Sequence, residues 1–276
     1  MKLLVMPSSI DEIKNTLNYC DAYLIGINNL SVNNNLSIDI NDLYEICSII
    51  GDKDLFINLN KNMSNSDIDY LKEVMNKLND YNIKGVFYYD VGVLNIYNNG
   101  NYNYDLVWAS EHATTNYNTI NYWYNYNVKY TLISSDITLN EIIDISKNSK
   151  CKLIVPAFGY QSMFNSKRHI VKNYLDFFEL NSDSNIFYME KEGNKYPIID
   201  NCEGTEVYTN YILNGIEEIS NINIEYGLIN GFNIDNSIDI LKLIKNKDYK
   251  QINEIISNTS SGFLYKETIA KVKKSE

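Results

Sequence analysis

Residues that can exchange protons follow two neighbouring apolar runs of the chain. Glu111 and His112 come just after the run Leu106–Ala109, and Asp90 comes at the end of the run Gly85–Tyr89. A carboxylate beside an imidazole is a common pair for general acid–base catalysis, so these three side chains are the predicted catalytic groups. Two alternatives stay open. Glu111 can cap the next helix with His112 simply solvated, which is favoured because adjacent side chains leave a strand in opposite directions, and Asp90 is equally suited to cap the following turn.

A second polar group follows the apolar run Lys152–Pro156. The guanidinium of Arg168, the only arginine in the chain, suits a carboxylate or a phosphate, with a structural ion pair as the alternative. Ser162 and His169 are of the right types for a nucleophile and its base, but no third member of a triad is identifiable. The predicted substrate-binding residues are Arg168, Asn116, Tyr160, Ser162 and His169.

These residues need a scaffold that brings the ends of several strands to one face. Short apolar runs alternate with amphipathic stretches, and the pairs Ser9/Glu12 and Thr138/Glu141 fit capping boxes at helix starts. The predicted strands are Leu3–Met6, Ala22–Ile27, Leu55–Leu59, Gly85–Tyr89, Leu106–Ala109, Tyr130–Ser134, Lys152–Pro156 and Tyr226–Ile229. Only a short helical turn, Gly92–Ile96, is expected between the fourth and fifth strands.

The alternation predicts an α/β fold, a closed (β/α)8 TIM-like barrel in which the first strand pairs with both the second and the eighth. An open doubly wound sheet is the alternative, but MPSSID stands after the first strand where that fold has a glycine-rich loop. Residues 1–276 are predicted to form one domain. An insertion of about 159–221, with a hairpin of Asn185–Met189 and Tyr196–Ile199, leaves the strand end where barrel enzymes keep their chemistry.

Composition narrows the classes of partner and cofactor. The net charge of −11 disfavours a protein that binds RNA by broad electrostatic attraction. No stretch approaches the ~20 apolar residues of a membrane span, and the apolar run at the start is short for a secretory signal, so a cytoplasmic protein without a membrane partner is expected. Four scattered cysteines and two histidines predict neither a metal site nor another cofactor. The sequence does not predict an oligomeric state.

Several stretches together resemble peptidase family U32, the collagenase-like proteases, and especially the short forms found in low-GC Gram-positive bacteria. The matching stretches are FYYDVGVLNI, TTNYNTINYW, PAFGYQSMFNSKRHIVKNY, KYPIIDNCEGTEVYTN and SGFLYKETIAKVKK. The resemblance implies a barrel that hydrolyses a peptide or protein substrate. Relatives in the family include RNA- and quinone-hydroxylation factors that carry an iron–sulfur cluster on four cysteines.

The chain departs from the family signature at three positions. By spacing, Ile154 stands where the signature has a glutamate, and Ser162 and His169 stand where it has cysteines. Iron–sulfur clusters need thiolates, so no cluster is expected. The first predicted function is therefore a metal-independent peptidase of the U32 type. The alternatives are an RNA-hydroxylation factor that lost its cluster and a non-catalytic binding protein.

Overall fold

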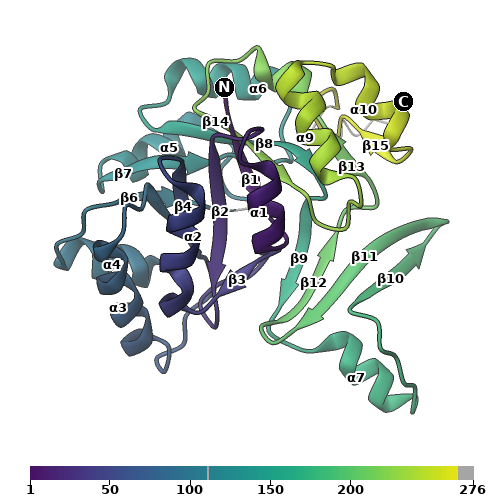
Figure 1. Ribbon diagram of the computed structural model, residues 1–276, viewed down its shortest axis with the longest axis horizontal. Helices are drawn as coiled ribbons and strands as arrows, with labels where there is room; N and C mark the ends of the chain where they lie inside the picture. Colours follow the sequence, from purple (N-terminus) through teal and green to yellow (C-terminus); the bar gives the residue numbers. More distant parts are fainter. Residues whose placement is uncertain (111, 267–276) are drawn as a thin grey trace, which may run out of the picture.

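The computed structural model describes residues 1–110 and 112–266, and eight parallel strands form a closed barrel (Figure 1). The barrel strands are β1 (Lys2–Met6), β2 (Ala22–Ile27), β4 (Asp54–Leu59), β5 (Gly85–Tyr88), β6 (Asp105–Trp108), β7 (Val128–Leu132), β8 (Lys152–Gly159) and β14 (Tyr226–Asn230). Strand β14 pairs with both β8 and β1, and β1 pairs with β2. The (β/α)8 barrel and the predicted pairing of its first strand are confirmed.

Helices cover the outside of the barrel. They are α1 (Ile10–Thr16), α2 (Leu43–Ile50), α3 (Ile68–Lys77), α4 (Val91–Asn99), α5 (Tyr117–Tyr124), α6 (Leu139–Asn148), α8 (Ile216–Ser220), α9 (Ser237–Asn246) and α10 (Tyr249–Ile255), with short 3-10 helices η1 (Ile40–Asp42) and η2 (Leu78–Asp80). Thr138 and Glu141 form the predicted capping box. Ser9 also caps its helix, but the Glu12 carboxylate bonds to the Ser8 amide instead of completing a box. The predicted short turn after β5 is wrong, because α4 is a full helix.

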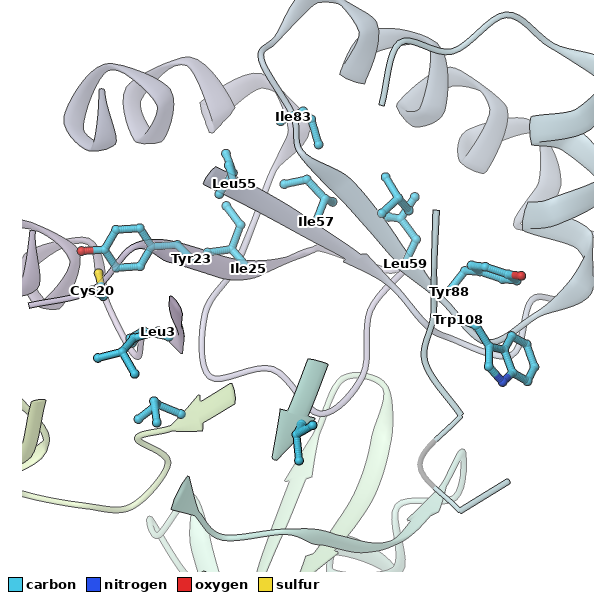
Figure 2. Close-up of a cluster of buried hydrophobic side chains, with 14 of the residues drawn as sticks. Leu3, Cys20, Tyr23, Ile25, Leu55, Ile57, Leu59, Ile83, Tyr88 and Trp108 are labelled. Atoms are coloured by element: carbon cyan, nitrogen blue, oxygen red, sulfur yellow. The ribbon is translucent and has the colours of Figure 1, made fainter. Parts of the chain in front are cut away.

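Alternating side chains of the strands fill two cores. Inside the barrel, Phe56 packs edge-on against Phe87, Tyr130 and Tyr226. Outside it, the intervening residues face the helices, and Figure 2 shows Leu55, Ile57 and Leu59 of β4 among buried side chains of the neighbouring strands. The interior is thus a packed core rather than a pore, which leaves the loops at the carboxyl ends of the strands as the place for a site.

The insertion between β8 and β14 forms an antiparallel sheet of its own. Its elements are β9 (Ser162–Ser166), α7 (Ile170–Phe177), β10 (Ile186–Lys191), β11 (Asn194–Asn201) and β12 (Gly204–Tyr208), in the order β10-β11-β12-β9. The β10–β11 hairpin confirms the predicted one. Three short strands complete the main sheet: β3 (Ser37–Ile38) beside β2, β13 (Ile212–Asn214) beside β8, and β15 (Thr259–Ser260) beside β13. None of the described helices is long and apolar enough to cross a membrane.

Candidate functional site

The loop 28–36, which follows β2, joins the barrel to the insertion. On the insertion side, the backbone amide of Asn33 donates to Glu206 Oε1 at 2.9 Å, and Asn33 Nδ2 donates to Ser162 Oγ at 3.2 Å. On the barrel side, the amide of Val32 donates to Asn60 Oδ1 at 2.9 Å. Every one of these bonds links residues far apart in sequence, so the loop fixes β9 and β12 over the mouth of the barrel.

The loop after β4 makes a second set of contacts with the insertion. Lys61 Nζ lies 3.0 Å from Glu203 Oε2 in the β11–β12 turn, and both side chains are largely shielded from solvent. Lys167, just past β9, donates through Nζ to the carbonyl oxygen of Asn62 at 2.6 Å. The insertion therefore rests on two loops of the barrel and leaves a hollow between them.

This hollow is a cavity of about 460 Å³, within the range of sites for small organic ligands. Its lining combines flat apolar surfaces, side-chain amides and cations. The residues are Val32, Asn33, Asn60, Lys61, Asn62, Tyr89, Ala109, Ser110, His112, Ala113, Met163, Phe164, Asn165, Lys167 and Glu203. The barrel contributes the strand ends and the insertion contributes β9 and the β11–β12 turn, so neither part forms the cavity alone.

His112 is the predicted catalytic residue that the structure places in the cavity lining. Its Nδ1 lies 2.9 Å from Asp136 Oδ2, and both side chains are about half exposed. A carboxylate on Nδ1 orients an imidazole and leaves Nε2 to exchange a proton with a ligand. Asp136 was not predicted, although it follows the sixth predicted strand just as Asp90 follows the fourth. Glu111 lies outside the described residues.

Asp90 and Asn116 act as helix caps in the structure. Asp90 accepts the Gly92 amide at 2.7 Å on Oδ1 and the Met63 amide at 2.9 Å on Oδ2, so both carboxylate oxygens are engaged. The exposed Asn116 accepts the Thr119 amide at 2.9 Å at the start of α5. The structure therefore shows Asp90 as a helix cap, the alternative to a catalytic role. Its second oxygen also links the start of α4 to the loop after β4.

Ser162 begins β9, whereas His169 lies three residues past the end of that strand, at the start of α7. Ser162 Oγ accepts a hydrogen bond from Asn33 Nδ2, and His169 Nδ1 lies 2.8 Å from Asp200 Oδ1 of β11. The five-residue strand between them spans roughly 13 Å. The structure therefore does not bring them together as a nucleophile and a base.

Tyr160 and Arg168 differ in their surroundings. Tyr160 lies near the mouth, half-buried, with its ring edge-on to Phe232, and burial raises the pKa of its phenol. With Ser162 it lines a second hollow of about 90 Å³, which shares Asn33 with the main cavity. Arg168 is exposed, and its guanidinium makes no hydrogen bond or ion pair with the residues that the structure describes. It is absent from the cavity lining.

The four cysteines are dispersed over the molecule. Cys20 and Cys151 are buried on the barrel, Cys47 is half-buried in α2, and Cys202 is exposed in the β11–β12 turn. Burial raises the pKa of the Cys20 and Cys151 thiols, which keeps them protonated. Within 1–110 and 112–266, no three His, Cys, Asp or Glu side chains gather in a way that could hold a metal ion.

Comparison with known proteins places the chain in a family. Residues 9–221 match the model of peptidase family U32. The chain belongs to this family. This U32 protein is 24% identical to tRNA hydroxylation protein P2 of Bacillus subtilis (strain 168) over 266 residues, covering 84% of this chain and 85% of that protein. The predicted resemblance is confirmed.

Solved structures are similar to this U32 protein at low sequence identity. A chain of the tryptophan synthase complex from Pyrococcus furiosus is 8% identical, with a TM-score of 0.44 and coverage of 93% of this chain and 96% of that one. KGPDC from Streptococcus mutans is 9% identical, with a TM-score of 0.41 and coverage of 91% and 98%. The barrel assignment rests on the strand pairing described above.

Proposed function

We propose that the protein takes part in the hydroxylation of tRNA and that the cavity at its barrel mouth binds one nucleoside of the RNA. The observation that carries this proposal is the mixed lining of the cavity, in which Tyr89 and Phe164 offer aromatic surfaces and Asn60 and Asn165 offer amides. Proteins that read single nucleotides stack the base on aromatic rings and bond its edges to such polar groups. The tRNA hydroxylation protein of Bacillus subtilis, 24% identical, supports the same substrate class.

The charges around the cavity suit an isolated nucleotide better than a long stretch of RNA. The chain carries a net charge of −11, so most of its surface repels a phosphate backbone. Lys167 is an exception, because it lines the cavity, donates to a backbone carbonyl oxygen and forms no close ion pair among the described residues, with Asp67 the carboxylate that its charge influences. We assign Lys167 to a phosphate next to the bound nucleoside, and His112, held by Asp136, to proton exchange with the base.

The test compares RNA binding and RNA modification in matched variants. Fluorescence anisotropy with a labelled tRNA transcript measures binding by the wild type, by Tyr89→Ala in the cavity and by Tyr44→Ala on the outside of α2. We expect Tyr89→Ala to bind roughly 5- to 100-fold more weakly, since stacking on one aromatic ring contributes about 1–3 kcal/mol per base. Tyr44→Ala should bind like the wild type.

The modification assay uses tRNA from cells with and without the protein. Nucleosides released from the tRNA are analysed by mass spectrometry for a species that carries one added oxygen atom. The proposal requires that this species disappears without the protein and does not return with Tyr89→Ala. A wild-type protein that neither binds tRNA nor changes its nucleosides would refute the proposal.

A metal-independent peptidase is the second candidate function, and the His112–Asp136 pair at the cavity favours it. An imidazole held by a carboxylate is the base that hydrolytic sites use to activate a hydroxyl group or a water molecule. Digestion of a peptide library in the presence of a chelator tests this function, with His112→Asn and Glu111→Gln as variants. Cleavage by the wild type that both variants lose would support the peptidase. No cleavage together with tRNA binding would leave the first proposal standing, and neither activity would indicate a non-catalytic binding protein.

A further inference from the structure

Helix α7 presents an apolar stripe to solvent. Ile170, Tyr174, Phe177 and Phe178 recur at helical spacing, all four are exposed, and Phe177 keeps 79% of its surface. None of the residues of α7 is buried. Figure 1 shows the helix at the free end of the insertion, away from the barrel. An apolar surface of this kind on a water-soluble helix indicates that another molecule covers it.

Among the described residues, the hydrogen bonds that join α7 to the rest of the insertion lie at the start of the helix. The amide of Lys172 donates to Asp200 Oδ2 at 3.0 Å, and the amide of Ile170 donates to Thr205 Oγ1 at 2.7 Å. These bonds fix the first turn of α7 to β11 and β12. An isolated helix of eight residues is marginal in water, because tertiary packing of its apolar side supplies most of a helix's stability. Leu175 is half-buried in the second half of α7, so what lacks packing among the described residues there is the stripe on the other side.

We propose that α7 packs against α7 of a second copy of this chain, forming a symmetric dimer. Most soluble oligomers are homo-oligomers, and a twofold axis buries the same patch on both subunits. With Leu180, the stripe exposes on the order of 600 Å² per copy, so covering it completely in both copies removes roughly 1,200 Å² from solvent, the lower end of stable protein interfaces. The stripe itself carries no cation, which makes a phosphate backbone a poor occupant.

The charged residues of α7 lie outside the stripe. Lys172 and Asp176 are on the opposite side of the helix and Glu179 follows it, so the stripe itself is uncharged and suits a like apolar surface. The dimer also has a consequence for the site, since the sheet that bears α7 supplies β9 and the β11–β12 turn to the cavity. A partner on α7 therefore steadies the insertion over the barrel mouth.

The test measures the mass of the full-length protein in solution across a concentration series. Sedimentation velocity or light scattering should give a dimer for the wild type at micromolar concentrations. Phe177→Glu places a charge in the stripe and should shift the protein to a monomer. The dissociation constant of the dimer should rise at least 100-fold. Tyr44→Glu is the matched control, since Tyr44 is an exposed aromatic residue on another helix, and it should leave the dimer intact.

Cross-linking tests the proposed contact without relying on stability. In a Cys202→Ser background, Tyr174→Cys should form a disulfide-linked dimer under mild oxidation, whereas Tyr44→Cys should not. A wild type that is monomeric up to about 100 µM would overturn the proposal, as would a dimer that Phe177→Glu leaves unchanged. A monomer whose tRNA binding is lost in Phe177→Glu would also overturn it and would identify RNA as the occupant of the stripe.

Discussion

Glu206 is the residue whose replacement tests the link between the insertion and the barrel most directly. It lies on β12 with 2% of its surface exposed, and none of the described residues forms an ion pair with it. Its carboxylate accepts the Asn33 amide at 2.9 Å, the Tyr208 hydroxyl at 2.7 Å and Asn201 Nδ2 at 3.3 Å. A buried carboxylate without a cation depends on such hydrogen bonds.

The expected effect follows from these bonds. Hydrogen bonds to a charged group contribute about 1.5–3 kcal/mol each, and two of the three are short. Glu206→Leu loses these hydrogen bonds but also removes a buried charge, and the second effect offsets part of the first. We therefore expect the free energy that holds the loop 28–36 against the insertion to fall by about 2–4 kcal/mol. That difference corresponds to amide exchange roughly 30- to 1,000-fold faster in the loop.

Hydrogen–deuterium exchange on peptides covering 28–36 and 204–208 measures the difference. Glu206→Gln keeps an oxygen for the Asn33 amide and should lie between the wild type and Glu206→Leu. Glu190→Leu, which alters an exposed glutamate of the same sheet, should exchange like the wild type. The reasoning is refuted if Glu206→Leu leaves exchange in the loop unchanged, or if Glu206→Gln is as labile as the leucine variant.

Three further predictions concern stability and composition. Burial acts to raise the pKa of Asp54, but the Tyr226 hydroxyl and two lysines outweigh it and hold the pKa below its ordinary value. The stability that this carboxylate contributes is present above its unfolded-state pKa and is lost as pH falls through its folded-state pKa. Asp54→Asn should therefore have a lower free energy of unfolding than the wild type at pH 7, and it should lose less of that free energy in acid. Urea unfolding of both proteins across a pH series measures the difference. Gly159→Ala should lower stability by at least about 2–3 kcal/mol in thermal unfolding, because a Cβ there meets the Asn230 carbonyl oxygen at 2.0 Å and φ is +110°. Gly51→Ala, with positive φ but open space, should cost less. Protein purified without air should contain no stoichiometric iron or acid-labile sulfide, since its cysteines are dispersed; near-stoichiometric amounts would contradict this.

The sequence by itself determined the barrel, because its signals are local. The barrel strands are short apolar runs and helices begin at capping residues within a few positions, so Leu3–Met6 and the Thr138 capping box are visible without any tertiary contact. Helix α4 was underestimated, because its glycine and asparagines lower helix propensity. Burial of Val93 and Leu94 stabilises the helix in the folded protein. The hairpin of the insertion was also predictable, since its two strands are neighbours in the chain.

The tertiary structure alone decided how the candidate site is assembled. His112 meets Asp136 and His169 meets Asp200 across 24 and 31 positions, so spacing in the sequence gives no sign of either pair. Asn33 contacts the insertion 173 positions away, and the pairing of β9 with β12 encloses the cavity. Nothing in one segment specifies these partners. They follow from the way the closed barrel brings its loops to one face and the insertion folds back over them.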